Sequence, residues 1–161
     1  MVIKKMLYKK MTHYDEDYYW SKRAIVIDPE SKKPQILKYY WLYKIKKMES
    51  YNGASLGTYV DHGAFFGGKP WLPHNLRGIH ISDQAVIGKN CTIYHQVTVG
   101  IAEAGGKAPV IGDNCILGAG CKVIGDIRVG NNVKIGANCV VHFDVPDNAT
   151  VVCEKARIIL K

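Results

Sequence analysis

From Ile81 onward, aliphatic residues recur along the chain every six residues. The recurrence is interrupted once, between Val99 and Ile111, and it resumes in the same frame. A period of six is neither the roughly 3.6-residue repeat of an amphipathic helix nor the plain alternation of a single strand. The aliphatic positions are Ile81, Ile87, Ile93, Val99, Ile111, Leu117, Val123, Val129, Ile135 and Val141.

Two further marks accompany this repeat. The residue after the aliphatic one is often glycine, at Gly88, Gly100, Gly112, Gly118, Gly130 and Gly136. Four residues after most of the aliphatic positions comes a second small or aliphatic side chain, at Ala85, Cys91, Val97, Cys115, Cys121, Ile127, Val133, Cys139 and Val145. The pattern predicts short strands joined at tight corners, three to a triangular coil of about 18 residues, with coils stacked by parallel pairing.

The rest of the chain carries weaker signals. We expect a strand over residues 23–27, a turn over 28–31, and a helix over 35–50 whose many aromatic residues leave a strand open. Residues 53–68 are rich in glycine and lead into the coils, and the tail after Pro146 is expected to fold back or cap the last coil. We therefore expect an all-β protein with a small α/β appendage over 1–58 and a β-helix over 59–161.

The chain is basic, with a net charge of +8, of which +6 lies in residues 1–50. A basic face can attract nucleic acid, anionic lipid or a phosphorylated ligand, or it can be an ordinary solvated surface. We expect no nucleic-acid partner, because no nucleic-acid-binding motif accompanies the charge. The sequence shows neither a membrane-spanning apolar run nor a signal peptide, so we expect a cytoplasmic protein.

Five cysteines are present, and none forms a Cys-x-x-Cys pair. Their odd number and the absence of a secretion signal argue against a disulfide framework, and their spacing argues against a metal site. Four of them occupy the small inward position of the repeat, which indicates core packing: Cys91, Cys115, Cys121 and Cys139.

Three segments carry a resemblance to a known family: GIHISDQAVIGKNCTIYHQVTVG at 78–100, APVIGDNCILGAGCKVIGDIRVGNNVKIGANCVV at 108–141 and DVPDNATVV at 144–152. From about Gly53 to Lys161, the chain resembles hexapeptide-repeat acyltransferases. It is most similar to serine acetyltransferase and to related acetyltransferases of bacterial polysaccharide synthesis. The resemblance implies a left-handed parallel β-helix, although parallel crossovers are normally right-handed. It also implies acetyl-CoA as co-substrate and a homotrimer with active sites between neighbouring subunits.

Acetyl transfer to a hydroxyl needs a base that takes the hydroxyl proton and a donor that stabilises the oxyanion. His74 is our first candidate for the base, because the family's catalytic histidine stands just ahead of a Gly-Ile or Gly-Val pair. His74 lies one residue further from Gly78 than in that motif, and Pro73 replaces the family's Asp. Asp61 is the candidate carboxylate that orients His74. His95, 21 residues after His74, is the candidate for acceptor binding or support in the same cleft.

By resemblance, the pantetheine arm of acetyl-CoA contacts the backbone at Gly118, Ala119, Gly136 and Ala137. Ala119 and Ala137 are 18 residues apart, one full coil. Lys134 is expected to meet the pyrophosphate as a point charge, and Arg157 the 3′-phosphate. We expect no metal.

Two departures from serine acetyltransferase shape the expected acceptor. The family's acceptor-binding His-Pro pair is Ala108-Pro109 here, and the long N-terminal helical domain of the family is missing. We therefore expect O-acetylation of a sugar or sugar-containing acceptor, with the loop over 101–109 covering the cleft. Serine O-acetyltransferase and a non-catalytic β-helix assembly protein are the alternatives. A zinc enzyme of the γ-carbonic anhydrase type is disfavoured, because the chain has no His-x4-His pair.

Overall fold

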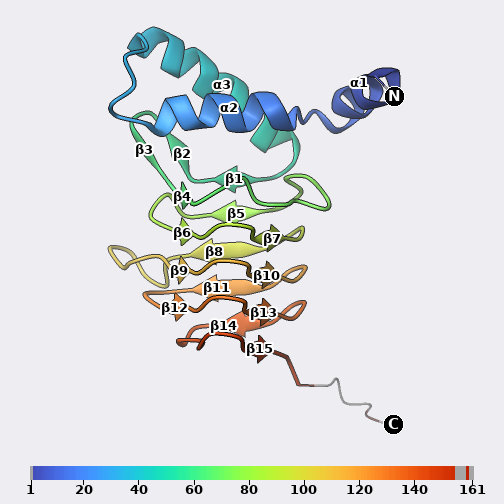
Figure 1. Cartoon of the computed structure of the whole chain (residues 1–161), viewed down its shortest axis with the longest axis vertical. Helices are drawn as coiled ribbons and strands as arrows, with labels where there is room; N and C mark the ends of the chain where they lie inside the picture. The colour runs from blue at the N-terminus through green and yellow to red at the C-terminus, as the bar shows by residue number, and fades with distance from the viewer. Residues whose placement is uncertain (1, 155–158, 160–161) are drawn as a thin grey trace.

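A computed structural model describes residues 2–154 and 159, with side chains from residue 6 onward. The chain forms a parallel β-helix with three helices packed at its N-terminal end (Figure 1). The coils descend from the helices one below another, and the last coil lies farthest from the helices. The predicted fold class, a left-handed parallel β-helix with an N-terminal appendage, is confirmed.

Three parallel sheets form the sides of the β-helix. The first has the order β1-β5-β8-β11-β14, with strands at Ser55–Leu56, His80–Ile81, Thr98–Gly100, Lys122–Ile124 and Val140–Val141. The second has the order β15-β13-β10-β7, at Thr150–Val151, Lys134–Ile135, Ile116–Leu117 and Thr92–Ile93. The third has the order β12-β9-β6-β4, at Arg128–Val129, Val110–Ile111, Val86–Ile87 and Phe65–Phe66. A short antiparallel hairpin, β2 (Thr58–Tyr59) and β3 (His62–Gly63), stands above the coils.

The period of six places one side chain of each strand in the core. All ten aliphatic positions of the repeat are buried, and so are the nine small or aliphatic positions that follow them. The four cysteines predicted to pack in the core are among these buried residues. Because each coil covers the next, the buried column runs without a break from the helices to the last coil.

One corner of the β-helix is held by a ladder of asparagines. The side-chain amide of Asn90 donates to Asn114 at 3.2 Å, Asn114 donates to Asn132 at 3.2 Å, and Asn132 donates to Asn148 at 3.0 Å. All four residues have a positive φ between 55° and 62°. Asparagine suits this corner because it tolerates the left-handed backbone region and its amide both donates and accepts.

The three helices are α1 (Val2–Thr12), α2 (Glu16–Ile27) and α3 (Gln35–Tyr51). The helix expected over 35–50 and the turn over 28–31 are confirmed. The strand expected over 23–27 is wrong, because this segment is the last part of α2. The Asp15 side chain caps α2 by accepting the Tyr18 amide proton at 3.2 Å. This cap and the burial of Val26 outweigh the strand preference of the Ile-Val-Ile run.

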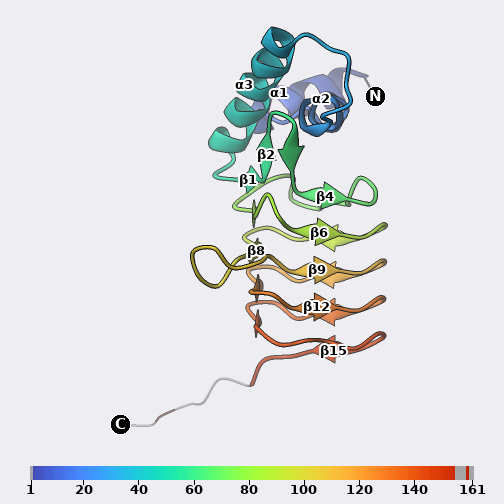
Figure 2. The same ribbon diagram turned by 90° about the vertical axis from the view of Figure 1, so that its left-hand side faces the viewer.

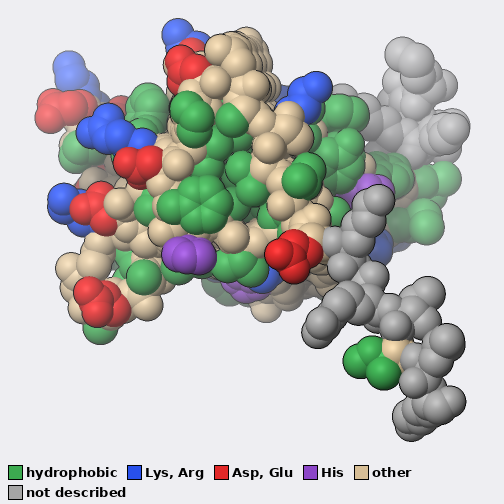
Figure 3. All heavy atoms as spheres, turned by 90° about the horizontal axis from the view of Figure 1, so that it is seen from below, with side chains coloured by type: hydrophobic (Ala, Val, Ile, Leu, Met, Phe, Trp, Pro, Cys, Tyr) green, Lys and Arg blue, Asp and Glu red, His purple; other side chains and the backbone are tan. Residues whose placement is uncertain are grey.

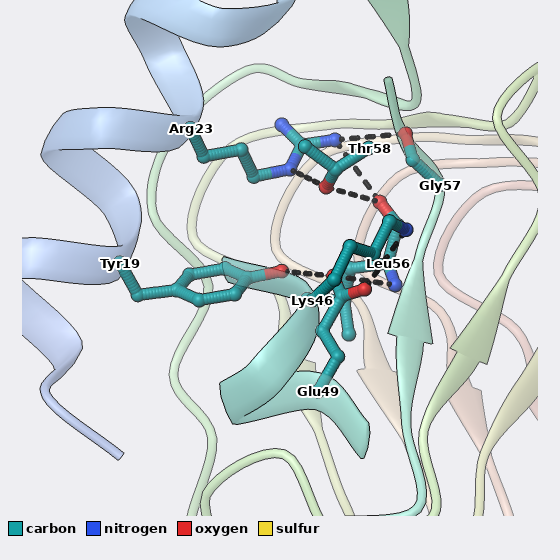
Figure 4. Close-up of polar contacts among 7 residues, drawn as sticks. All are labelled: Tyr19, Arg23, Lys46, Glu49, Leu56, Gly57 and Thr58. Atoms are coloured by element: carbon teal, nitrogen blue, oxygen red, sulfur yellow. Dashed lines mark hydrogen bonds and ion pairs between the residues drawn. The ribbon is translucent and has the colours of Figure 1, made fainter. Parts of the chain in front are cut away.

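A buried polar network fastens the helices to the first coil (Figure 4). The Arg23 guanidinium donates to the carbonyl oxygens of Leu56 at 3.1 Å and Ala64 at 2.7 Å. The Glu49 carboxylate accepts from the Tyr19 hydroxyl at 2.6 Å and from the Leu56 amide at 3.2 Å. These charges are buried, but each has several hydrogen-bond partners, as buried charges require.

The helices and the β-helix meet at the end of α3. β1 follows four residues after Tyr51 and already pairs with β5 of the β-helix. The boundary between residues 58 and 59 stays a prediction. No helix within the described residues is long and apolar enough to cross a membrane.

Candidate active site

A second corner of the β-helix brings three of the predicted site residues, His95, Ala119 and Ala137, into one column. Backbone hydrogen bonds between successive coils define it: Gln96 N donates to Arg77 O at 2.9 Å, Gly120 N to His95 O at 2.9 Å, and Asn138 N to Ala119 O at 2.8 Å. Arg77, His95 and Ala119 therefore lie one below another, with Ala137 next to Asn138 in the coil below. We call Arg77, His95, Ala119 and Ala137 the corner column.

The column needs left-handed corners, and the sequence supplies residues that tolerate them. Gly78, Gln96, Gly120 and Asn138 have φ values of 65°, 60°, 70° and 58°. At its φ of 70°, Gly120 would place a Cβ 2.2 Å from Asn138 Oδ1, so glycine is favoured between these two coils.

His74 lies in the turn that leads into this column. The turn is fixed by hydrogen bonds from Asn75 N to Leu72 O and from Ile79 N to Leu76 O, both of 3.0 Å. Leu72 and Leu76 are buried and anchor the turn, whereas His74 is exposed. Asn75 has a positive φ of 56° within the turn over residues 73–78, where the extra residue before Gly78 lies.

The structure brings His74 and His95 together. Their ring centroids lie 4.8 Å apart at an interplanar angle of 86°. His95 is partly buried, and its Nδ1 is buried without a hydrogen-bond partner within the described residues. A buried nitrogen without a partner is costly, so Nδ1 is suited to receive a hydrogen bond from a bound molecule or to donate one to it.

A cavity of about 330 Å³ borders His74. Its walls come from α1 and from the turn before β5: Tyr8, Met11, Thr12, Pro73, His74, Asn75 and Arg77. The Tyr8 hydroxyl accepts from the Asn75 side-chain amide at 3.1 Å and closes one wall. The Arg77 side chain is exposed, and within the described residues its guanidinium has no acidic partner. The cavity therefore combines an imidazole and a free cation.

Arg77 and Tyr8 were not among the residues that the sequence pointed to. Tyr8 lies 67 residues before Asn75 in the chain, and no pattern along the sequence indicates their contact. The one available signal for Arg77 was its place between His74 and Gly78.

Asp61 lies apart from these histidines. Its carboxylate accepts from Lys38 Nζ at 2.5 Å and from Gln35 Nε2 at 2.9 Å. The hydrogen bond from Lys38 lowers the pKa of Asp61 below its usual value. Within the described residues, no hydrogen bond joins Asp61 to His74. The structure thus places Asp61 in an ion pair with α3 and does not bring it to the candidate base.

The predicted acetyl-CoA residues lie lower in the β-helix. β10 and β13 pair in register, with Ile116 opposite Lys134 and Leu117 opposite Ile135. Gly118 N donates to Ile135 O at 2.8 Å, and a Cβ on Gly118 would lie 2.6 Å from that oxygen. The accessible residues here are small, apart from one cation. Ala137 is exposed, Ala119 and Gly136 are partly exposed, and the exposed Lys134 supplies the positive charge. Arg157 lies outside the described residues.

The loop over 101–109 leaves the coil between β8 and β9, as expected (Figure 2). Lys107 of this loop forms an ion pair with Asp126 at 3.0 Å. Ala108 and Pro109 are buried where the chain rejoins the coil. The role of the loop as a cover over the cleft stays a prediction.

Comparison with known proteins agrees with this geometry. Residues 108–142 match the family model of the bacterial transferase hexapeptide (six repeats). The chain is 36% identical over 130 residues to serine acetyltransferase of Synechococcus elongatus. The aligned region is 76% of this chain and 53% of the relative. It is 41% identical over 107 residues to serine acetyltransferase of Helicobacter pylori. The aligned region is 65% of this chain and 62% of the relative. The chain belongs to the hexapeptide-repeat acyltransferases. Its β-helix is similar to that of serine acetyltransferases.

Solved structures give the same result. Serine acetyltransferase isoform 3 of Entamoeba histolytica, in complex with cysteine, superposes with a TM-score of 0.64 at 34% identity and covers 76% of this chain and 43% of its own. Serine acetyltransferase of Neisseria gonorrhoeae, in complex with serine, has a TM-score of 0.61 at 35% identity and covers 76% of this chain and 48% of its own. The chain thus spans about half the length of these relatives.

The expectation of a sugar acceptor is wrong, because these relatives and structural neighbours are serine acetyltransferases. That expectation gave weight to Ala108, a single position, and to the absence of a long helical domain. The similarity extends over most of the β-helix and outweighs one substitution in it. Three helices also precede the β-helix, although they are short.

Proposed function

We propose that this protein transfers an acetyl group from acetyl-CoA to the hydroxyl of serine. The similarity to serine acetyltransferases over 130 residues supports the donor and the acceptor. The contact between His74 and His95 beside a cavity is the observation that carries the proposal, because it supplies a base where a small acceptor fits.

In this mechanism the acceptor lies in the cavity beside His74. The His74 imidazole takes the hydroxyl proton as the oxygen attacks the thioester carbonyl. His95, whose ring lies 4.8 Å from that of His74, supports the base and the bound acceptor from behind the cavity. The Arg77 guanidinium pairs with the acceptor carboxylate. It thereby binds the acceptor in place of the family's histidine, which is Ala108 in this chain.

Acetyl-CoA lies along the corner column below His95. The small side chains of Ala119 and Ala137 leave the backbone amides accessible to the pantetheine arm, and Lys134 meets the pyrophosphate. A backbone amide near the thioester stabilises the tetrahedral oxyanion. The acetyl group passes directly to the acceptor in a ternary complex, and the thiol of CoA leaves with the proton. No covalent acyl-enzyme is required.

We further propose that the protein works as a homotrimer with its active sites between neighbouring subunits. Three flat sides of a triangular β-helix are suited to packing around a threefold axis. His74 is exposed in the single chain, which leaves room for a neighbouring subunit to complete the site.

An acceptor panel tests this proposal. Release of free thiol from acetyl-CoA is measured with serine, serine amide, which lacks the carboxylate, and several nucleotide sugars. We expect turnover with serine and at least 10-fold lower kcat/KM with serine amide, since a charged hydrogen bond contributes about 1.5–3 kcal/mol. In Arg77→Gln the preference for serine over the amide should disappear, whereas Arg128→Gln on β12 should keep it. Turnover with a sugar but not with serine would overturn the proposal.

A further inference from the structure

Two cysteines are in contact at the end of the β-helix opposite the helices. Cys139 Sγ and Cys153 Sγ lie 2.6 Å apart. Cys139 is buried, with 2% of its surface exposed, at the corner between β13 and β14. Cys153 is exposed and follows β15 by two residues. Both are free thiols in this structure.

The register of the last coil brings these two cysteines together. β15 pairs with β13, with Thr150 opposite Lys134 and Val151 opposite Ile135. The chain then continues past the same corner, so that Cys153 Sγ lies 3.7 Å from Ala137 O. Cys153 thus lies at the lower end of the corner column and against Cys139.

Figure 3 views the molecule from this end and shows hydrophobic side chains across its centre. The exposed hydrophobic residues of the last coil and the segment after it include Val140, Phe143 and Val152. Cys121, one coil above, is fully buried, whereas Cys139 has no complete coil below it. Cys153 therefore occupies the place that the next coil would fill.

We propose that Cys139 and Cys153 form a reversible disulfide that fastens the segment after β15 to the last coil. The oxidant is a low-molecular-weight disulfide. The Cys153 thiolate attacks one of its sulfurs, so that a mixed disulfide forms and one small thiol leaves. Cys139 then attacks Cys153 Sγ and releases the second small thiol. Both protein thiols lose their protons to the two leaving thiols, and the protein is oxidised by two electrons.

The environments of the two thiols set their order of reaction. Burial, together with the hydrogen bond with Cys153, raises the pKa of the Cys139 thiol to about 11. Cys139 is therefore a poor first nucleophile, and the exposed Cys153 reacts first. The other three cysteines, Cys91, Cys115 and Cys121, are buried inside the coils. The disulfide forms with little backbone movement, because the two sulfurs already touch.

The full chain is incubated with oxidised glutathione and then digested without reduction. We expect one peptide pair linked through Cys139 and Cys153, and a fall in free thiols from the five in the sequence to three. Cys121→Ala is the matched control, because it removes a thiol and leaves the pair, and it should still form the link. Cys153→Ala, at an exposed position, should remain folded and form no disulfide.

A second measurement follows the stability of the oxidised protein. Closing a short loop with a disulfide typically stabilises a protein, so Tm should rise by several degrees on oxidation of the wild type and not of Cys153→Ala. Three results would overturn the proposal: five free thiols after oxidation, glutathione that stays attached to Cys153, or a disulfide between other cysteines. Each can be read without measuring acetyl transfer, so the proposed function and this inference fail separately.

Discussion

His95 is the residue whose surroundings most clearly call for a ligand. Its carbonyl is bonded to Gly120 of the next coil, which fixes the corner, while its buried Nδ1 has no partner within the described residues. The carbonyl oxygen of His95 thus has a hydrogen-bond partner in the β-helix, whereas Nδ1 of its side chain has none within the described residues. The centroid of its ring lies 4.8 Å from that of His74, so His95 adjoins the candidate base.

Replacement of His95 by alanine should lower kcat/KM for serine by about 10- to 100-fold, the loss expected when one or two hydrogen bonds to the acceptor are removed. The KM for acetyl-CoA should stay within about 2-fold, because the proposed acetyl-CoA site lies lower in the column. Steady-state kinetics with each substrate varied in turn measures both values. An equal rise in the KM values for serine and acetyl-CoA would contradict this role and would show that His95 only maintains the structure of the site.

At this scale the sequence predicts His74 and His95 as candidate site residues, because both belong to motifs that are local in the chain. The cavity beside His74 is not local, since Tyr8 and Met11 of α1 form one wall of it. Asp61 illustrates the opposite difficulty. Its distance along the chain from His74 suggested a partner, but its contact with Lys38 depends on how α3 packs against the hairpin.

At the scale of elements, the asparagine ladder sets the shape of one corner over four coils. Asn114→Ala removes the two side-chain hydrogen bonds of Asn114 in the ladder. It also places alanine, which unlike asparagine has no polar side chain to stabilise the left-handed backbone, at a φ of 58°. We expect a loss of about 3–4 kcal/mol in the free energy of unfolding, because left-handed backbone costs about 1–2 kcal/mol and the two lost hydrogen bonds about 1 kcal/mol each. Asn114→Gly should lose less, since glycine takes this φ freely. Urea denaturation of the two variants measures the difference, and equal losses would contradict a backbone effect.

The ion pair between Lys38 and Asp61 connects α3 to the hairpin and should make stability depend on pH. The pKa of Asp61 is lowered in the folded state, so its contribution is present above the ordinary value of about 3.9 and is lost as pH falls through the lower folded value. Asp61→Asn should lower Tm at pH 7, because the buried Lys38 ammonium loses its anionic partner. The difference from wild type should shrink below about pH 4. A Tm difference that is the same at pH 7 and pH 3 would show that the ion pair contributes nothing.

The elements themselves divide into those that the sequence predicts and those that it does not. The strands of the β-helix follow from the period of six, because every coil repeats the same burial. Residues 23–27 were misassigned, since an Ile-Val-Ile run favours a strand and only the capping and packing of α2 make it helical.

At the scale of the whole molecule, a single chain presents the corner column and the His74 cavity on its surface. We expect the protein to sediment as a homotrimer, with about three times the mass of the 18.0 kDa chain. Analytical ultracentrifugation at micromolar concentration measures this mass. A stable monomer that retains full acetyl transfer would contradict the placement of active sites between subunits.

The polar network of Arg23 and Glu49 makes the helices and the β-helix one body at their junction. This matters for the site, because one wall of the His74 cavity comes from α1 and the other from the turn before β5. The position of the helices on the first coil therefore helps to shape this cavity.

The most direct test of the account is the formation of O-acetylserine from serine and acetyl-CoA, detected by mass spectrometry, for wild type, His74→Ala and His80→Ala. His80 is an exposed histidine on β5 and serves as the matched control. We predict product with wild type and His80→Ala, and a loss of about 100- to 10,000-fold in kcat with His74→Ala while acetyl-CoA still binds. A His74→Ala variant that forms O-acetylserine within about 3-fold of the wild-type rate would contradict the account.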